Sequence, residues 1–541
     1  MSENRFIFFH GYDELLWHGY EKNGLIDEFA GVRFCQSLLL PERKKFNELA
    51  KKDGKLFKLI SDNNYPWYID RLQGGGYIDE YRYNTELIDS LGNFYGFQMH
   101  ECISNMRSDY FKLKNLDAAA WSEELIVKEI LRLFPFKHIF LEAATAKEYA
   151  ELFPVPLYFE QLTDNARKLL EMRQEITSGQ LLPCDSVMMA PKLEFKLGVK
   201  RIMPEIGAQT PRAAIQLSYA RGMSRAYKKS FGAYYEPWGG QPFSVCNYNA
   251  DGENEWNIHG GEFPFESAGS NGGSSRSLQK RLLIYAYLAG AEFVAEEWGG
   301  YNTFYDLKDF TLSPYGKTKR LFLRFAEKYP AGEFYSPMAA VLPKDMLILE
   351  NKVCDEWFES IPYIDKQQQE SHAAMRDGIE ELMGASCSLY GNETGTLINS
   401  DTPDAFDIIH ADCEAAFRRY KYLVDLTGDS AFAEKHSNAI TVEEAKRLIP
   451  EIMPVKVVGG VHWFMNRISD GWYLTVFNND GIDKSVENGE KQITDAIRIA
   501  EIDLKSCSCI IPLEGSRDVT LKDGKYYVKI FAGDYFFAKI S

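Results

Sequence analysis

Glutamates that follow short apolar segments are the residues of this sequence whose type and spacing could do chemistry. Four of them stand where a short run of apolar residues gives way to glycine, tryptophan or another acid, and the fifth ends the segment NFYGFQMHE. The candidates are Glu101, Glu205, Glu236, Glu296 and Glu297. Two carboxyl groups that face each other can break a glycosidic bond: one protonates the leaving oxygen, and the other acts as nucleophile or as base to a water. We therefore expect catalytic carboxylates among these five residues.

More carboxylates are present than the two catalytic roles require, and the surplus would bind sugar hydroxyls. Glu296 and Glu297 are adjacent, and neighbours in a strand point to opposite faces, so we expect only one of them to reach the site. Glu142, in LEAAT, is a further candidate in plainer surroundings. The structural alternative for Glu236 is an ion pair with an arginine such as Arg221 or Arg225.

Aromatic and polar residues next to these acids are candidates for substrate binding. Aromatic residues make up 14% of the chain, and flat rings can stack on the faces of sugars. The expected substrate-binding residues are Trp67, Asp70, Arg71, His100, Tyr235, Trp238, Trp298 and Tyr301. Each ring could instead belong to the core, and Asp70 and Arg71 could form a surface ion pair.

The glutamates need elements that bring them to one place, and the sequence around them predicts a (β/α)₈ barrel. The stretch 201–240 has the pattern strand, loop, helix, strand, loop, and the stretch 274–300 continues it. Apolar runs predict eight strands, at about 5–11, 55–61, 93–101, 137–145, 181–189, 201–205, 231–236 and 291–296. The aromatic stretch 63–83 is expected to be a long loop. In such barrels the C-terminal ends of the strands carry the chemistry, which is where the glutamates fall.

Two further domains are expected after the barrel. We place the barrel at 1–335, an α/β domain at 336–452 and an all-β domain at 453–541. The middle range contains FDIIHAD and YKYLVDLTGD, which are typical of parallel strands, and Thr441 with Glu444 forms a capping-box pattern before a helix. From Val455 the apolar residues alternate with polar ones between Asn-Asp-Gly and Lys-Asp-Gly turns.

Composition argues against several other classes of function. The net charge of −17 and pI near 5.2 disfavour nucleic acid and anionic membranes as partners. The start of the chain shows no secretory pattern, and nine scattered cysteines without a CxxC motif suggest reduced thiols, so we expect a cytoplasmic protein. Nine scattered histidines and the lack of glycine-rich nucleotide motifs predict neither a metal nor a cofactor.

The domain order resembles that of glycoside hydrolase family forty-two β-galactosidases, which belong to the large clan of retaining (β/α)₈ glycosidases. AGAEFVAEEWGGYNTFYDLKDFTLSPYGK is similar to their eighth strand, SPMAAVLP to the entry of their flavodoxin-like domain and GWYLTVFNNDG to their C-terminal β domain. The resemblance implies an α/β fold: a TIM (β/α)₈ barrel, a flavodoxin-like domain and a small C-terminal β-sandwich. It implies a nucleophile at strand seven, here Glu236. That clan ends strand four with Asn-Glu, where this sequence has Leu141-Glu142.

The expected function is therefore a retaining glycoside hydrolase that acts on small β-linked glycosides or oligosaccharides without a cofactor. Its partners would be a small carbohydrate and, through the middle domain, further copies of the chain. The alternative is a non-catalytic carbohydrate-binding protein on a degenerate barrel. Such a protein would keep the aromatic rings and lose the facing pair of carboxyl groups.

Overall fold

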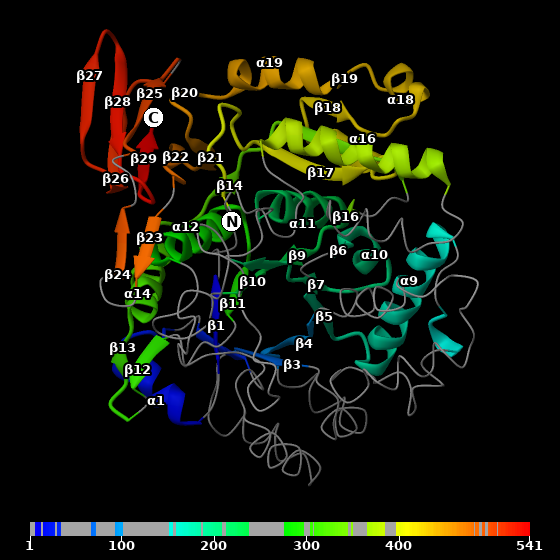
Figure 1. The fold of residues 1–541 in the computed structure, drawn as a ribbon, viewed down its shortest axis with the longest axis horizontal. Helices are drawn as coiled ribbons and strands as arrows, with labels where there is room; N and C mark the ends of the chain where they lie inside the picture. Colours follow the sequence, from blue (N-terminus) through cyan, green and yellow to red (C-terminus); the bar gives the residue numbers. More distant parts are fainter. Residues whose placement is uncertain are drawn as a thin grey trace.

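The structure is a computed structural model, and it shows a parallel barrel, a second parallel sheet and two antiparallel sheets (Figure 1). It describes residues 6–11, 14–27, 30–33, 67–71, 92–100, 151–154, 158–184, 188–207, 213–236, 275–296, 303–306, 308–344, 348–349, 365–384, 397–480, 482–485, 489–492, 496–505 and 507–541. The helices, strands and side-chain contacts of the structure are those of these residues.

Eight parallel strands form the sheet of the N-terminal half, in the order β5-β4-β3-β2-β1-β11-β10-β8. They are β1 (Ile7–Gly11), β2 (Ala30–Arg33), β3 (Trp67–Arg71), β4 (Phe94–His100), β5 (Leu181–Cys184), β8 (Glu205–Gly207), β10 (Ala233–Glu236) and β11 (Phe293–Glu296). The short strands β7 (Arg201–Ile202) and β9 (Ser230–Phe231) precede β8 and β10 and pair with each other. The Met203 amide donates to the Pro183 carbonyl at 3.0 Å, which joins the two edges. The predicted barrel is thus present as a nearly closed parallel sheet.

The first half of the barrel differs from the prediction in which segments supply its strands. The second position is taken by β2, a four-residue strand too short to stand out in the sequence. The third is β3, which lies inside the stretch 63–83 that was predicted to be a loop. That prediction was wrong because Tyr68 packs outside the sheet and Ile69 inside it, so both faces of the segment are buried. The predicted strand at 55–61 lies outside the described residues.

The segment that supplies the fourth barrel strand also differs from the prediction, and this changes which glutamate follows that strand. The segment 93–101, predicted to be strand three, forms β4, and β4 pairs directly with β5. The predicted strand at 137–145 lies outside the described residues. The fourth strand end therefore belongs to β4, and the residue that follows it is Glu101.

Side chains along the barrel strands alternate between its interior and its outside. Ile7, Phe9, Ile69, Leu182, Cys184, Met203, Tyr234, Phe293 and Ala295 pack together inside. Their neighbours, among them Phe8, Val32, Tyr68, Met99, Ile206 and Val294, belong to the larger core outside the sheet. When a parallel sheet is covered on both faces, the sequences of its strands are continuous apolar runs. This explains why the barrel strands appear as such runs in the sequence.

Helices accompany the barrel strands in the second half of the barrel, where most of them were predicted. The helices of the N-terminal half are α1 (Glu14–Lys22), α9 (Phe159–Ile176), α10 (Pro191–Lys196), α11 (Ala213–Tyr227), α12 (Arg276–Leu288) and α14 (Pro314–Lys328). Two have serine caps: Ser275 accepts from the Leu278 amide, and Ser313 accepts from the Gly316 amide, each at 3.1 Å. The small strands nearby are β6 (Met188–Met189), β12 (Phe304–Asp306), β13 (Thr311–Leu312) and β16 (Ile348–Leu349).

The second parallel sheet has the order β17-β15-β18-β19. Its elements are β15 (Met338–Leu342), α16 (Lys366–Met383), β17 (Phe406–His410), α17 (Glu414–Phe417), β18 (Tyr422–Asp425), α18 (Ser430–Lys435), β19 (Ala439–Ile440) and α19 (Val442–Ile452). The predicted capping box is present, because Thr441 accepts from the Glu444 amide and the Glu444 side chain accepts from the Thr441 amide. The first strand lies second in this order, as in flavodoxin-like sheets, and the flavodoxin-like assignment itself stays a proposal.

The C-terminal residues form two antiparallel sheets, in the orders β14-β21-β22-β29-β26 and β20-β25-β28-β27. Their strands are β14 (Glu333–Phe334), β20 (Lys456–Val458), β21 (His462–Ile468), β22 (Gly471–Phe477), β25 (Arg498–Asp503), β26 (Ile510–Gly515), β27 (Val519–Lys522), β28 (Lys525–Ile530) and β29 (Tyr535–Ile540), with a separate hairpin of β23 (Ile482–Ser485) and β24 (Gly489–Gln492). The β-sandwich assignment and the domain boundaries remain proposals. β14 lies just inside the range predicted for the barrel and pairs with β21.

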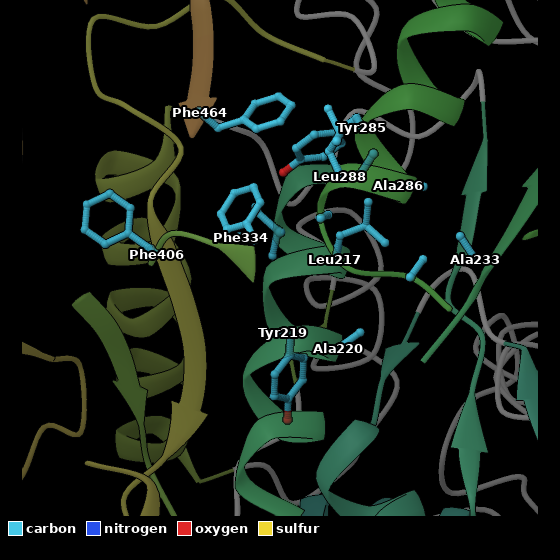
Figure 2. Close-up of a cluster of buried hydrophobic side chains, with 14 of the residues drawn as sticks. Leu217, Tyr219, Ala220, Ala233, Tyr285, Ala286, Leu288, Phe334, Phe406 and Phe464 are labelled. Atoms are coloured by element: carbon cyan, nitrogen blue, oxygen red, sulfur yellow. The ribbon is translucent and has the colours of Figure 1, made fainter. Parts of the chain in front are cut away.

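Helix α11 lies between the barrel and the second sheet, and its packing joins them (Figure 1). Gly222 approaches β17 so closely that a Cβ atom would lie 2.2 Å from the Ile408 carbonyl oxygen. Figure 2 shows Phe334 between side chains of α11 and Phe406, next to Phe464. The Phe334 ring stacks on that of Phe464 with centroids 5.5 Å apart. The contact is therefore apolar at its centre and too close for any side chain at position 222.

Gly222→Ala should destabilise the fold by about 2–3 kcal/mol, because the new Cβ meets backbone that cannot rotate away. Gly378→Ala in α16 is the matched control, since its Cβ would meet only the end of the Leu426 side chain, at 2.6 Å. There the gain in helix propensity, about 1 kcal/mol, should offset the crowding. Urea unfolding of both variants measures the difference. Equal stabilities would show that the α11–β17 contact tolerates displacement.

Candidate active site

The C-terminal ends of the barrel strands are the place where this fold usually carries its active site. The described strand ends there are Gly11 of β1, Arg33 of β2, Arg71 of β3, His100 of β4, Cys184 of β5, Gly207 of β8, Glu236 of β10 and Glu296 of β11. The chain supplies cationic, acidic and imidazole groups at one edge of a single sheet. This edge is therefore the first place to look for chemistry.

Four fully buried polar side chains lie in the upper part of the barrel interior, and we call them the lumen cluster. They are Arg33, Gln98, Glu205 and Tyr234, each 0% exposed. The Arg33 Nε donates to the Gln98 Oε1 atom, and the guanidinium carbon lies 4.8 Å from the centre of the Tyr234 ring. A cation over an aromatic ring gains from the negative face of that ring. Arg33 is thus held by β4 on one side and by β10 on the other.

Glu205 belongs to the lumen cluster by its place in the strand. Met203 packs inside the barrel and Ile206 packs outside it, so the alternation of the strand directs the Glu205 side chain inward. Its Cα pairs in register with that of Tyr234. The Gln216 Nε2 of α11 donates to the Glu205 carbonyl at 2.7 Å, which fixes the backbone at this strand end. The structure thus places Glu205, a predicted catalytic carboxylate, next to Tyr234, whose ring contacts Arg33.

The lumen cluster favours negative charge at the barrel mouth. A buried cation stabilises the charged form of a nearby carboxyl group and lowers its pKa. Buried charges are expensive unless they are paired and hydrogen-bonded, so the buried Arg33 favours an ionised carboxyl group in the barrel interior. A glycosidase nucleophile needs this state, because it must be a carboxylate when it attacks.

Glu296 lies on the other face of the sheet, in a second polar cluster that we call the outer cluster: Glu296, Lys319, Thr303 and His10. The Lys319 ammonium of α14 forms an ion pair with Glu296 and donates to the Thr303 hydroxyl at 2.5 Å. Burial raises the pKa of Glu296, against the attraction of Lys319, and it lowers the pKa of Lys319. Val294, two residues earlier, packs in the core outside the barrel. Glu296 therefore faces α14, and its ion pair with Lys319 joins β11 to that helix.

His10 shares the outer cluster and is buried as a neutral ring. Its Nε2 donates to the Leu25 carbonyl at 3.0 Å, and its ring lies 4.6 Å from that of Tyr20. Burial lowers the pKa of His10 well below its ordinary value, and the nearby Lys319 charge lowers it further. The imidazole thus packs beside the Lys319–Glu296 pair and Tyr20 of α1 without adding a charge.

Two predicted sugar platforms have other surroundings in the structure. Tyr235 is fully buried in the core outside the barrel, one residue from the inward Tyr234. Trp67 begins β3 at the N-terminal end of the barrel, where its ring meets that of Tyr95 edge-on at 5.7 Å. The Tyr235 ring therefore faces away from the barrel interior, and Trp67 lies at the end of the barrel opposite the mouth. Arg221 and Arg225, the expected alternative partners of Glu236, are held by Asp407 at 2.7 and 2.6 Å.

The remaining candidates are placed by backbone alone or not at all. Asp70 and Arg71 end β3, His100 ends β4 and Glu236 ends β10. The other candidates, Glu101, Glu142, Trp238, Glu297, Trp298 and Tyr301, lie outside the described residues.

Sequence reasoning missed Arg33, Gln98 and Lys319. Arg33 follows only three apolar residues, Ala-Gly-Val, which is too short a run to mark a strand. Gln98 stands within the predicted strand, and its alternation with Phe97 and Met99 was the available signal. Lys319 is a helix residue that only the fold brings to Glu296.

The described residues contain no cluster of three or more histidine, cysteine, aspartate or glutamate side chains that could hold a metal. Among the described helices, none combines the length and apolar character that a membrane span requires.

Comparison with known proteins gives only remote likenesses. No protein-family model and no curated sequence matches the chain. One similar solved structure is α-L-fucosidase isoenzyme 2 from Paenibacillus thiaminolyticus, with a TM-score of 0.35 and 8% identity over 98% of this chain and 90% of that one. Another is an α-amylase from H. orenii, with a TM-score of 0.19 and 10% identity over 77% and 64%.

A third is the catalytic domain of GH30 xylanase C from Talaromyces cellulolyticus, with a TM-score of 0.14 and 11% identity over 64% and 88%. These neighbours are glycoside hydrolases. At such low TM-scores they establish no family for this chain, and they give no support to the link with family forty-two β-galactosidases.

Acidification should destabilise the fold through His10. Its pKa is depressed in the folded state, so the unfolded chain binds the extra proton below pH 6.5. The stabilisation is present above that pH and is lost on lowering it, by about 1.4 kcal/mol per pH unit. His10→Gln keeps a donor for the Leu25 carbonyl and does not titrate. Urea unfolding between pH 7.5 and 5 should therefore show a slope that is shallower by this amount in His10→Gln.

The matched control is His18→Gln, because the His18 side chain is 76% exposed. Its pH dependence should follow that of the unsubstituted protein. Identical slopes for His10→Gln and His18→Gln would contradict the neutral buried state of His10.

Proposed function

We propose that this protein is a glycoside hydrolase that cleaves small β-linked glycosides or oligosaccharides at the C-terminal mouth of its barrel. The observation that carries the proposal is the lumen cluster: a buried arginine and a buried glutamate inside the barrel, near the strand end that carries Glu236. A sugar substrate presents hydroxyls and one scissile oxygen, so acids and amides are the groups that it needs. The remote glycosidase neighbours agree with this reading and are not its basis.

Glu236 is our candidate for the nucleophile. It ends β10, the seventh strand when β7–β8 and β9–β10 are each counted as one. Position 236 is two residues beyond Tyr234, whose ring lies in the barrel interior, so the strand period directs it to the same side. The clan of retaining barrel glycosidases that the sequence resembles has its nucleophile at this strand end. Arg33, next to Tyr234, would favour the ionised form.

Glu101 is our candidate for the general acid and base. It follows β4, the fourth strand of the barrel, which is the strand that supplies the acid and base in the resembled clan. Sequence reasoning gave that position to Glu142, and the pairing of β4 with β5 moves it to Glu101. A retaining mechanism requires the two carboxyl groups to be about 5–5.5 Å apart, across the mouth.

Glu205 and Glu297 complete the proposed site. Glu205 neighbours the nucleophile strand and would bind a hydroxyl or orient Glu236. Since Glu296 is paired with Lys319 outside the barrel, the expectation that one of the two adjacent acids serves the site passes to Glu297. Trp238, Trp298 and Tyr301 remain proposed sugar platforms, with Asp70, Arg71 and His100 as polar contacts.

The rest of the sequence-based description belongs to the same proposal. It comprises a flavodoxin-like middle domain, a C-terminal β-sandwich, a cytoplasmic location, catalysis without a cofactor and contacts between copies through the middle domain. Each follows from composition or from the resemblance described above, and each can be tested separately.

Glu236→Gln and Glu101→Gln should each lower the rate of aryl-glycoside hydrolysis by about 10³-fold, since each removes a catalytic carboxyl group and leaves its shape. Glu205→Gln and Glu297→Gln should have smaller effects, with a larger change in KM. A panel of aryl glycosides measures the rates. Glu171→Gln on α9 is the matched control, because its carboxylate is surface-exposed and pairs only with Arg167 among the described residues.

Two outcomes would contradict the proposal. Hydrolysis that survives both Glu236→Gln and Glu101→Gln would dismiss this catalytic pair. Binding of sugars without cleavage of any glycoside would favour the carbohydrate-binding alternative.

A further inference from the structure

A large cavity opens at the N-terminal ends of the barrel strands, on the side opposite the proposed active site. Its volume is about 880 Å³, and its walls include Phe6 before β1, Ser230 of β9 and Glu292 before β11. A second cavity of about 200 Å³ shares Arg225 and Arg419 with the first. We call the two together the basal groove. The volume of the larger cavity falls within the range of small-molecule sites, about 300–1,000 Å³.

Cationic side chains dominate the described lining of the basal groove. Besides Arg221, the cations are Arg225, Lys228, Lys229, Arg419, Lys421 and Arg467. Two carboxylates, Glu292 and Glu333, share the lining. Asp407 lies beneath it as a third and pairs with Arg221 and Arg225, so seven cations and three carboxylates leave an excess of four positive charges. The whole chain has a net charge of −17, so the groove opposes the general field of the protein.

The carboxylates at the centre of the groove are already neutralised. Glu333 lies between Arg467, at 2.5 Å, and Arg419, at 3.4 Å. Burial raises the pKa of Glu333, but the hydrogen bond from Arg467 and the charges of three arginines outweigh it, so the pKa lies below its ordinary value. The acid therefore stays ionised and balances part of the two arginines. It does not remove the positive excess.

Lys228 and Lys229 supply the positive charges of the basal groove that are most accessible to a ligand. They follow the last residue of α11 and are exposed at the rim of the larger cavity, and no ion pair to either is present within the described part of the chain. The C-terminal ends of α11 and α12 open on the same groove, and each contributes about half a negative charge. About three positive charges remain after that correction. The negative helix ends therefore do not neutralise the two lysines.

Aromatic side chains form the remaining wall of the larger cavity. Tyr95, Phe231, Tyr287 and Phe334 line it. The lining of the larger cavity thus combines aromatic side chains with cationic ones. A ligand that matches both kinds of side chain has a flat or ring-shaped body and a compact group with two negative charges.

We propose that the basal groove binds a small organic phosphate, with the phosphate at Lys228 and Lys229 and the ring against the aromatic wall. This binding site is separate from the barrel mouth and goes beyond the proposed hydrolase activity. A phosphate ester carries nearly two negative charges at neutral pH, which matches the excess of the groove. A nucleoside monophosphate and a phosphorylated sugar share this chemistry.

Isothermal titration of the full chain with AMP and glucose 6-phosphate tests the proposal, with adenosine and glucose as uncharged counterparts. At least one phosphate ester should bind, and its uncharged counterpart should not displace it. The double variant Lys228→Gln/Lys229→Gln should weaken that binding about tenfold or more, since each lysine loses a charge-assisted hydrogen bond. The ester that binds more tightly identifies which kind of ring the wall accepts.

The matched control is Lys366→Gln/Lys522→Gln, which removes two exposed lysines outside the groove and should leave the affinity unchanged. Glu236→Gln serves as a second comparison, because it alters the barrel mouth alone. No binding of either ester at millimolar concentration would overturn the proposal. So would an affinity that Glu236→Gln changes and the groove lysine pair does not, since that result would place the phosphate ester at the mouth.

Discussion

Asp407 is the residue on which the assembly of this molecule depends. It belongs to β17 and is fully buried against α11. Its carboxylate accepts hydrogen bonds from Arg221, from Arg225 and from the Tyr420 hydroxyl, the last at 2.8 Å. Burial raises the pKa of Asp407, but the two arginines and Tyr420 lower it below the ordinary value. Removing one partner of such a group leaves an uncompensated buried charge, which costs several kcal/mol. The carboxylate therefore ties β17 of the second sheet to a barrel helix.

That helix in turn positions the proposed site. The same α11 that carries Arg221 also carries Gln216, which holds the Glu205 carbonyl at the barrel mouth. Both ends of the helix are thus fixed by polar contacts, one to a strand end and the other to the second sheet. The barrel mouth and the basal groove lie at opposite ends of this one rigid element.

The second half of the barrel could be predicted from the sequence, and much of the first half could not. Long helices follow or precede strands β8, β10 and β11. The spacing of apolar residues changes from that of a strand to that of a helix, and this change marks the limits of each strand. β2 and β3 have four and five residues, and a segment this short is a strand only because its neighbours pair with it. The same limit applies to the site. Glu205 was found because it ends the strand predicted at 201–205, whereas Arg33 depends on contacts with Gln98 and Tyr234 that no local pattern contains.

The burial of α11 on both sides also bears on how the chain folds during synthesis. Phe334 covers part of the α11 face that carries Arg221, but the carboxylate that pairs with Arg221 belongs to Asp407, 186 residues later in the chain. At about 5–20 residues per second this interval lasts about 10 to 40 s on the ribosome. During it the two arginine charges of α11 lack the carboxylate that pairs with them in the finished fold. The nascent barrel thus carries a surface suited to a chaperone before the second sheet arrives to replace it.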